Sequence, residues 1–273
     1  MPELPEVETT RLGISPFLLD KTIQAVFVRQ PNLRMKVPPL NELCSGQKVL
    51  AITRRAKYLL LHLTKGYLLI HLGMSGHLRI VQPSVYHDKH DHIDMLLDGE
   101  HTLRYNDPRR FGLWLYLSDN PQEHPLLSHL GPEPLSDMFN VEYLSKRAHK
   151  KRQNIKSFIM RNDIVVGVGN IYATESLFLA GINPLSAASS VKQAQMAKLV
   201  AYIKQVLEQA IQAGGTTLRD FYAIDGKPGY FAQQLQVYGR KNLPCFQCNH
   251  SIEVVVIGGR SSAFCPYCQP LRP

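Results

Sequence analysis

The sequence has few cysteines, little acidic charge and no long apolar run, and each shortage excludes a class of protein. Its 5 cysteines in 273 residues are too few for a disulfide scaffold in a chain of this length. No apolar run approaches the roughly 20 residues of a membrane-spanning helix. The amino-terminal segment has neither the basic nor the apolar region of an export signal. We therefore expect a cytoplasmic protein.

Acidic residues are outnumbered by basic ones. The 31 Lys and Arg against 22 Asp and Glu give a formal net charge of +9. An excess of this size indicates a polyanionic partner, with nucleic acid first and an acidic membrane second. Hydrophobic residues make up 44% of the chain, which is enough for a real core, and the length allows two domains and a small additional module.

The chain has a strand-like pattern in its first part and a helical pattern in its second. After a helix expected over 6–18, the region 22–117 contains eight short segments rich in Val, Ile, Leu and Tyr, separated by turn residues: 22–29, 48–53, 58–63, 67–71, 77–81, 92–97, 102–105 and 112–117. Strands at this spacing predict a sandwich or barrel rather than a parallel sheet. From Pro132 the pattern becomes helical, with helices expected over 144–160, 171–180, 191–213 and 217–221 and a loop over 223–229.

Four of the five cysteines form two C-x-x-C pairs separated by sixteen residues, the spacing of a four-thiolate zinc site: Cys245, Cys248, Cys265 and Cys268. The segments 252–257 and 261–264 between the pairs alternate like the arms of a hairpin that turns at Gly258-Gly259. The alternative is a redox dithiol, but redox motifs do not come as two matched pairs. We predict one structural zinc ion, since four thiolates leave no coordination position open. The remaining Cys44 is expected to be a small buried residue.

The first residues, Met1-Pro2-Glu3, could carry covalent chemistry. Removal of Met1 would leave Pro2 with a secondary amine whose pKa lies near the α-amino reference of about 8. A neutral amine can attack a carbonyl-like carbon and form a cationic iminium, and the adjacent Glu3 carboxyl could transfer protons. The alternative is an ordinary helix start, with proline in the first turn and acids at the positive end of the dipole. The two readings are compatible, because a helix beginning after Pro2 would also fix the amine in space.

A glycine-rich segment and a basic run indicate phosphate contacts. In Gly167-Val168-Gly169-Asn170 we expect the asparagine to cap the following helix and the glycines to let the backbone approach an anion. A plain helix cap is the alternative. The run 146–152 includes Lys150 and Lys151 and contains no acidic residue, which favours nucleic-acid binding over a mixed solvated face.

Four turn-like segments carry further candidates. The segment 54–57 is basic, and 107–111 combines a proline turn, Arg109 and Phe111, a composition suited to entering a duplex. The third segment places Met74 between Gly73 and Gly76. Met74 and Phe111 are each either a core residue or an exposed side chain that wedges between bases. Arg260, beside the hairpin glycines, suits a groove or phosphate contact, or is a solvated turn residue.

Together these motifs resemble those of the formamidopyrimidine-DNA glycosylase family of bacterial repair enzymes. The anchors run in order over the whole chain: residues 2–8, 54–58, 71–76, 107–112 and 167–172 and the four cysteines. The resemblance implies an α+β multidomain fold. We expect a β-sandwich domain with a leading helix over 1–131, a helical domain with a helix–two-turn–helix over 132–234, and a zinc ribbon over 235–273.

The resemblance also implies a bifunctional glycosylase and lyase that excises oxidised purines such as 8-oxoguanine from duplex DNA and then cleaves the strand. It makes Pro2 the Schiff-base nucleophile, Glu3 the proton donor and Lys57 the general acid of β-elimination. Arg260 would serve δ-elimination and contact a phosphate. The family acts as a monomer without a small-molecule cofactor.

The resemblance assigns DNA contacts as well. Three residues match those that fill the void left by the extruded base, with Arg109 facing the unpaired cytosine: Met74, Arg109 and Phe111. Five match backbone-binding positions: His71, His90, Lys150, Lys151 and Asn170. The segment 216–230 matches the loop that covers the lesion, and Arg219 stands there in place of the lysine of other members.

Two alternatives remain open from the sequence. An endonuclease VIII-type enzyme for oxidised pyrimidines would share Pro2, Glu3 and the ribbon, although Leu4 and the three void-filling residues favour the purine enzyme. A non-catalytic DNA-binding protein would explain the charge and the cysteines but not Pro2 and Glu3.

Overall fold

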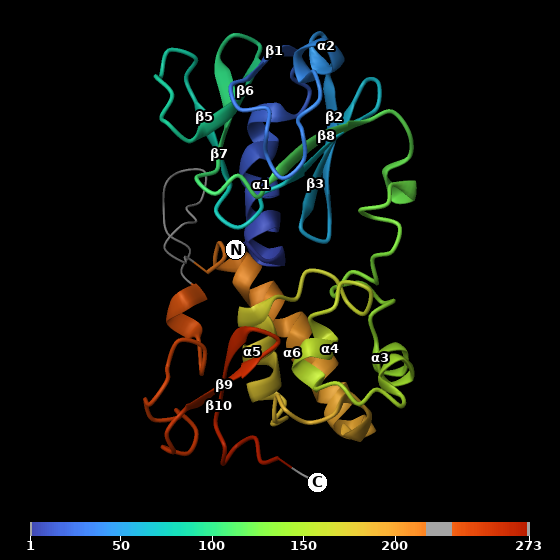
Figure 1. The fold of residues 1–273 in the computed structure, drawn as a ribbon, viewed down its shortest axis with the longest axis vertical. Helices are drawn as coiled ribbons and strands as arrows, with labels where there is room; N and C mark the ends of the chain where they lie inside the picture. Colours follow the sequence, from blue (N-terminus) through green and yellow to red (C-terminus); the bar gives the residue numbers. More distant parts are fainter. Residues whose placement is uncertain (1, 217–230, 272–273) are drawn as a thin grey trace. The chain divides into compact units, whose positions relative to one another are not determined.

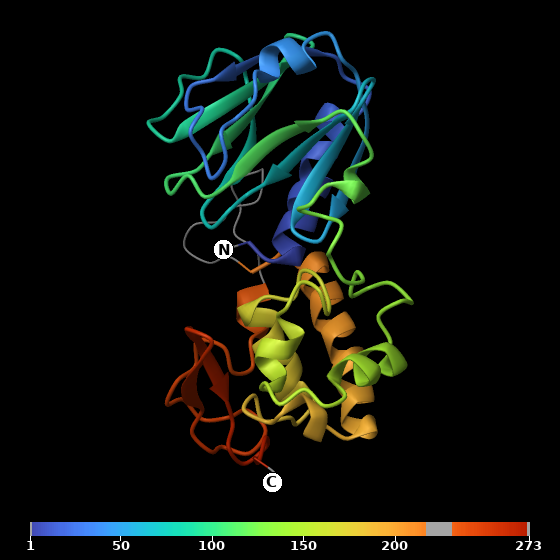
Figure 2. The ribbon, with the colours of Figure 1, turned by 45° about the vertical axis from the view of Figure 1, so that its right-hand side comes forward.

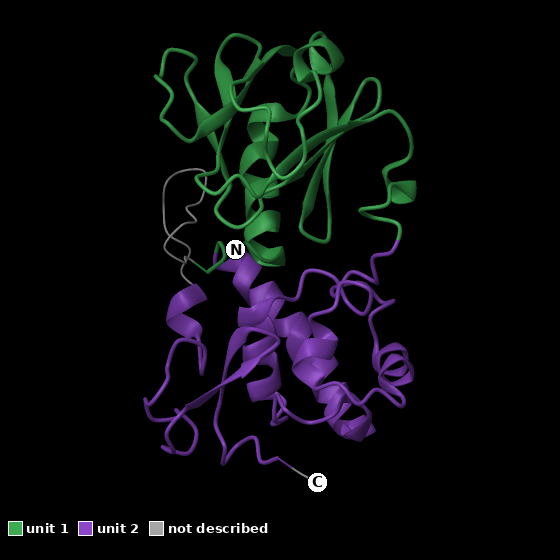
Figure 3. Ribbon diagram, viewed as in Figure 1, with its two compact units in different colours: residues 1–128, 214–230 green, residues 129–213, 231–273 purple. Residues whose placement is uncertain are grey.

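The computed structural model describes residues 2–216 and 231–271. The described residues fall into two compact units, the first within residues 1–128 and 214–230 and the second within residues 129–213 and 231–273 (Figure 3). The expected helix over 217–221, the loop over 223–229 and Arg219 lie outside the described residues. Among the residues that are described, no helix is both long and apolar enough to cross a membrane.

The first unit is a β-sandwich, as predicted. One sheet has the order β1-β6-β7-β5 and contains β1 (Ile23–Val28), β5 (His77–Val81), β6 (Asp91–Leu97) and β7 (His101–Asn106). The other has the order β2-β3-β4-β8 and contains β2 (Val49–Arg55), β3 (Tyr58–Leu63), β4 (Tyr67–His71) and β8 (Leu113–Leu117). Every neighbouring pair is antiparallel, and a short helix, α2 (Leu40–Cys44), packs on β1.

The leading helix α1 (Leu4–Leu18) packs against β2, β3 and β5 and therefore against both sheets (Figure 1). Its buried residues Val7, Ile14 and Leu18 belong to the same hydrophobic core as the inner faces of the strands. The single tryptophan, Trp114, is fully buried in that core. Cys44 is fully buried there too, as expected.

The second unit is helical, with α3 (Val141–Ala148), α4 (Ile155–Ile159), α5 (Asn170–Leu179) and α6 (Gln193–Gln212) around one core. The single helix predicted over 144–160 is wrong. Asn154 caps α4 by accepting a hydrogen bond from Ser157 N, and Lys150 adopts φ 58° between the two helices. Asparagine side chains favour such caps over helix interiors. The boundary was missed because the many basic residues around it are equally compatible with a continuous helix.

The hairpin predicted from the cysteine spacing is present, with β9 (Glu253–Ile257) and β10 (Arg260–Phe264) on either side of Gly258-Gly259. It lies beside α5 (Figure 2). A buried glutamine attaches the second cysteine pair to the helical part. Gln269 donates from Nε2 to Ile182 O (2.7 Å) and accepts from Cys265 N (3.0 Å), while its carbonyl accepts from Asn183 Nδ2 (2.8 Å).

Candidate functional site

The amino-terminal motif begins α1 with both of its first residues buried. Glu3 is the N-cap and forms a capping box with Glu6, whose Oε2 accepts from Glu3 N at 2.8 Å. Oε1 of Glu6 accepts from Thr216 N at 2.9 Å, which ties the start of the predicted lesion loop to the same helix. Only 4% of Glu3 is exposed. Pro2 is itself buried directly before this capped helix start.

Glu8 acts on the basic turn at 54–57 rather than on the amino terminus. Its carboxylate accepts from Arg11 at 2.6 Å and from Arg54 Nε at 2.8 Å. Burial acts to raise the pKa of Glu8, but the hydrogen bonds and charges of the two arginines outweigh it and lower that pKa. Arg54 also donates to Ala56 O (2.8 Å), which fixes the turn that presents Lys57.

Strand register gathers the predicted residues of the first unit at one end of the sandwich. Tyr58, which follows Lys57, pairs with His71, and His71 pairs with Leu113, two residues after Phe111. The loop 72–76, which follows β4, and the loop 107–112, which precedes β8, therefore lie at the same end of two neighbouring strands. The backbone oxygen of His90 joins this end by accepting from Asp107 N at 3.0 Å.

His71 is held as a neutral donor. Burial and then the nearby cations Lys57 and Arg34 lower its pKa to about 4, against the opposing charge of Asp107. Its Nδ1 accepts from Gly73 N at 2.9 Å, so the proton of the neutral ring is on Nε2. A neutral imidazole with Nε2–H can donate a hydrogen bond to a phosphate oxygen.

The three void-filling candidates lie on these loops and reach solvent. Phe111 is 50% exposed and Met74 is 37% exposed, so neither is a core residue. Arg109 is exposed too, and its Nη1 lies 3.8 Å from the sulfur of Met74. Two exposed apolar side chains beside an arginine suit insertion between bases. Asp107 is a residue that the sequence motifs left without a role, although it is the first residue of the motif that contains Arg109 and Phe111.

In the second unit, Lys156 connects the phosphate-binding candidate Asn170 to the hairpin. Its Nζ donates to Asn170 Oδ1 (2.6 Å), Ser262 Oγ (2.6 Å) and Ser261 O (3.2 Å), and only 1% of the residue is exposed. Nδ2 of Asn170 also donates to Ser261 O at 3.0 Å. The prediction that Asn170 caps α5 is wrong, because Gly169 occupies the cap position and the asparagine side chain is used in this network.

All five lysines and arginines of the basic run 146–152 are exposed. Lys150 and Lys151 lie after the end of α3. Arg147 pairs with Asp163 at 3.1 Å, an acidic partner that lies outside the run in sequence. Arg260 is exposed at the start of β10, where it pairs with Ile257 across the glycine turn.

The four cysteines come together as predicted. Their sulfur atoms all lie within 4.8 Å of one another, with Cys248 to Cys265 at 3.4 Å and Cys245 to Cys268 at 3.9 Å. Four sulfurs at about 2.3 Å from a tetrahedral zinc would be about 3.8 Å apart. The donor set and spacing thus fit a structural metal ion. Two of the four residues, Cys245 and Cys265, are fully buried.

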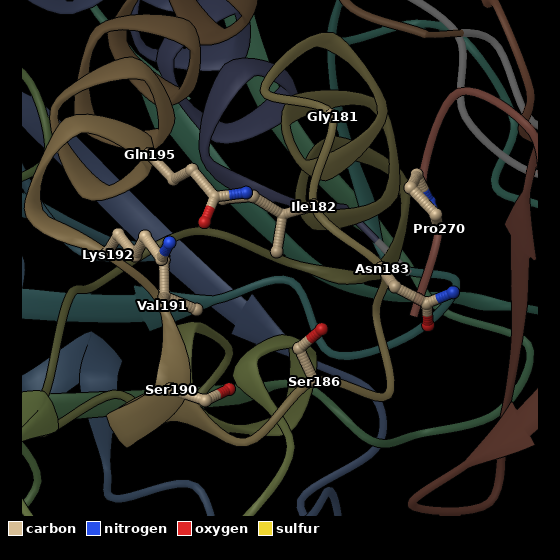
Figure 4. A pocket seen from close by; sticks show the side chains of 9 residues that line it. All are labelled: Gly181, Ile182, Asn183, Ser186, Ser190, Val191, Lys192, Gln195 and Pro270. Atoms are coloured by element: carbon tan, nitrogen blue, oxygen red, sulfur yellow. The ribbon is translucent and has the colours of Figure 1, made fainter. Parts of the chain in front are cut away.

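The cavity in Figure 4 is separate from these groups. It is lined by the turn after α5, the start of α6 and Pro270, and includes Asn183, Ser186 and Lys192. None of the predicted catalytic or DNA-contacting residues lines it, so it is not the candidate active site.

A β-sandwich with arginine and apolar side chains on its end loops, a helical unit and a four-cysteine hairpin define a nucleic-acid-binding protein with a metal-stabilised ribbon. Three family models match the chain: "Formamidopyrimidine-DNA glycosylase N-terminal domain" over 1–114, "Formamidopyrimidine-DNA glycosylase H2TH domain" over 130–222 and "Zinc finger found in FPG and IleRS" over 242–271. The chain belongs to the formamidopyrimidine-DNA glycosylase family.

Individual relatives agree along the whole chain. The formamidopyrimidine-DNA glycosylase of Legionella pneumophila is 62% identical over 99% of both chains. A Lactococcus lactis enzyme bound to DNA containing Fapy-dG has a TM-score of 0.92 and 32% identity, covering 98% of this chain and 100% of that one. A MutM protein bound to DNA containing carbocyclic 8-oxo-G has a TM-score of 0.91, 32% identity and the same coverage. A Lactococcus lactis enzyme bound to abasic-site DNA has a TM-score of 0.91 and 31% identity, covering 98% and 99%.

Proposed function

We propose that this protein is a bifunctional DNA glycosylase and abasic-site lyase that removes oxidised purines from duplex DNA in base excision repair. The observation that carries the proposal is that Pro2 and Glu3 lie at the buried, capped start of α1 in a chain whose full-length relatives are named formamidopyrimidine-DNA glycosylases. Related structures hold DNA with Fapy-dG, 8-oxo-G and abasic sites, which supports the substrate class. An enzyme of this kind works where the chromosome is, and we place it in the cytoplasm.

Catalysis in this proposal starts at the amino terminus. With Met1 removed, the Pro2 nitrogen attacks C1′ of the damaged nucleotide, the bond from C1′ to the base breaks, and the base leaves with the proton lost from the Pro2 nitrogen. Glu3 then donates a proton to the ring oxygen O4′ as the C1′–O4′ bond breaks. The product is an iminium between Pro2 and the opened sugar. Burial of the helix start and its capping box support this role, because a nucleophile needs a fixed position.

The lyase steps use the acidity of the iminium. Loss of a C2′ proton expels the 3′ phosphate, and Lys57, presented by the turn that Arg54 braces, acts as the general acid. A second elimination, served by Arg260, expels the 5′ phosphate, and water then hydrolyses the iminium, which frees the sugar from Pro2 and leaves a one-nucleotide gap. No redox or nucleotide cofactor enters these steps.

Duplex binding is assigned to two sets of residues. The neutral His71, together with His90, Lys150, Lys151 and Asn170, contacts the phosphate backbone. Met74, Arg109 and Phe111 fill the space of the extruded base. Their exposure at loop tips supports this assignment, since a base must leave the stack before chemistry can reach it.

The metal of the ribbon is proposed to be zinc, held by Cys245, Cys248, Cys265 and Cys268. Thiolate-only tetrahedral sites prefer zinc, and a ribbon of this size needs the ion to fold. We also propose three domains, over 1–131, 132–234 and 235–273, and a monomeric enzyme.

Borohydride trapping tests the proposal directly. Purified protein, shown by intact mass to lack Met1, is incubated with an 8-oxoguanine:cytosine duplex and with a thymine-glycol duplex. We expect a covalent adduct and faster excision with 8-oxoguanine. A preference for thymine glycol would favour the pyrimidine-specific alternative, and the absence of any adduct from folded protein would favour a binding protein.

A further inference from the structure

We propose that Asp107 is the positioning residue that joins the loop of Met74 and the loop of Arg109 and Phe111 into one void-filling unit. The inference rests on the proposed function and deepens it. Asp107 itself is fully buried and does not reach the substrate.

The carboxylate of Asp107 accepts hydrogen bonds from both loops. Oδ1 accepts from Ser75 Oγ at 2.7 Å, directly after Met74, and from Arg109 N at a longer 3.3 Å. Oδ2 accepts from Gly112 N at 2.9 Å, directly after Phe111, and from Tyr105 Oη at 2.9 Å. Arg109 itself and the residues that directly follow Met74 and Phe111 therefore share one buried carboxylate.

The two loops also touch through their backbones, which leaves no room for side chains. A Cβ on Gly73 would lie 2.4 Å from Gly112 N, and one on Gly76 or Gly112 would lie 2.6 or 1.8 Å from the hydroxyl of Tyr105. Gly73 in addition adopts φ +72°, a conformation that favours glycine. Contact this close means that one loop cannot shift without the other.

The ordinary reading is that Asp107 only stabilises the sandwich. Two of its donors are backbone N–H groups next to or within the exposed Arg109–Phe111 segment, so the same carboxylate that lies in the sandwich also sets the course of that segment. Buried hydrogen bonds to a charged acceptor are strong and specific in geometry. The hydrogen bonds of Asp107 can therefore fix the position from which the exposed side chains of Arg109 and Phe111 enter the duplex.

Asp107→Asn tests the inference with minimal change in shape. The asparagine side chain has one acceptor oxygen, which should face Gly112 N because that backbone donor is the closer one, at 2.9 Å. The side-chain NH₂ group then faces Arg109 N, and because both groups are donors, the hydrogen bond from Arg109 N is lost. Ser75→Ala removes the hydroxyl that donates to Asp107 Oδ1 and accepts from Arg109 N at 3.3 Å, so it separates the Met74 loop from both partners and leaves the Asp107 carboxylate in place. Tyr105→Phe is the matched control, because it removes one hydroxyl from the same carboxylate but leaves both loops attached.

Three measurements separate positioning from folding. The first is single-turnover excision of 8-oxoguanine opposite cytosine and opposite adenine; the second is cleavage of a preformed abasic site in single-stranded DNA, which has no opposite base. The third is the fluorescence of Trp114, which reports the folded sandwich core. We expect Asp107→Asn to slow duplex excision on the order of tenfold or more and to reduce the cytosine preference. Ser75→Ala should do so to a smaller extent, with single-strand cleavage unchanged in both.

Equal losses in duplex excision and single-strand cleavage would overturn the inference, as would wild-type excision and cytosine preference in folded Ser75→Ala. If Asp107→Asn does not fold, Ser75→Ala against Tyr105→Phe decides alone. The proposed function fails on a different result, namely that the wild-type protein does not excise 8-oxoguanine at all.

Discussion

The ammonium group of Lys156 lies 2.6 Å from Oδ1 of Asn170 and is almost completely buried. A buried cation is costly unless hydrogen bonds satisfy it. Lys156 donates such bonds to Asn170 and to two residues of β10. The start of α5 and the hairpin that bears Arg260 are therefore attached through Lys156 as well as through the direct hydrogen bond from Asn170 Nδ2 to Ser261 O. Two groups proposed to contact DNA depend on this attachment.

Lys156→Met should weaken duplex binding, although Lys156 is not among the residues proposed to contact DNA. Methionine fills a similar volume, but Asn170 Oδ1 and Ser262 Oγ lose their partner, at about 1–3 kcal/mol for each unsatisfied group. We expect a lower melting temperature and about tenfold weaker binding of an abasic-site duplex, while zinc content is retained. Lys151→Met is the control, since that exposed residue should lower affinity only through its charge. Unchanged affinity in Lys156→Met would show that the network does not position the DNA contacts.

Glu3→Gln and retention of Met1 should each stop base excision for a different reason. The amide cannot supply the proton but leaves the helix start in place, so duplex binding should persist. An additional residue moves the terminal amine by about 3.5 Å, beyond bonding distance of C1′. Excision and borohydride adducts, measured on samples whose mass fixes the state of the terminus, check both. Near-wild-type excision by either protein would contradict the assigned role.

Cys265→Ser should release the ribbon. Three thiolates hold the metal poorly, and the ion supplies much of the folding free energy of a small hairpin. We expect loss of zinc and weaker duplex binding, with unchanged Trp114 fluorescence because that residue lies in the other unit. Cys44→Ala is the matched thiol control and should keep its zinc. Tight DNA binding by protein verified to lack metal would refute the link between zinc and affinity.

The sequence predicted the sandwich strands and the cysteine site well, because both signals are local. The segments 58–63, 67–71 and 77–81 coincide with β3, β4 and β5, since strand length, apolar content and turn residues all agree there. The break between α3 and α4 was missed because lysines and arginines do not reveal where a helix ends. The roles of Asp107 and Lys156 depend on partners up to 106 residues away, which no local pattern reveals.

His71 should make the protein less stable in mild acid. Its folded pKa of about 4 lies below the usual 6.5, so protonation favours the unfolded chain. The stabilisation is complete above pH 6.5 and is lost as the pH falls towards 4, by at most about 3 kcal/mol. His71→Asn, whose amide oxygen can still accept from Gly73 N, should flatten this part of the curve. Urea unfolding between pH 4 and 7 would measure it, and identical slopes in both proteins would contradict the neutral assignment.

The void-filling residues give the sharpest test of the site. Extrusion of a base costs a few kcal/mol of stacking and pairing, which inserted side chains offset. Phe111→Ala should therefore slow 8-oxoguanine excision strongly, while binding to undamaged duplex, which phosphate contacts dominate, stays nearly intact. Its melting temperature should change little, because the ring is 50% exposed.

Arg109→Ala should slow excision in the same way and also lower the preference for cytosine opposite the lesion, since no guanidinium would face that base. Leu12→Ala, which removes an apolar side chain 49% exposed on α1, controls for the loss of exposed apolar surface and should leave excision unchanged. Excision opposite each of the four bases, measured beside thermal melting, separates the two roles. If the loss of excision by Phe111→Ala merely followed the loss of folded protein, or if Arg109→Ala kept full cytosine preference, these side chains would be surface residues and not the wedge.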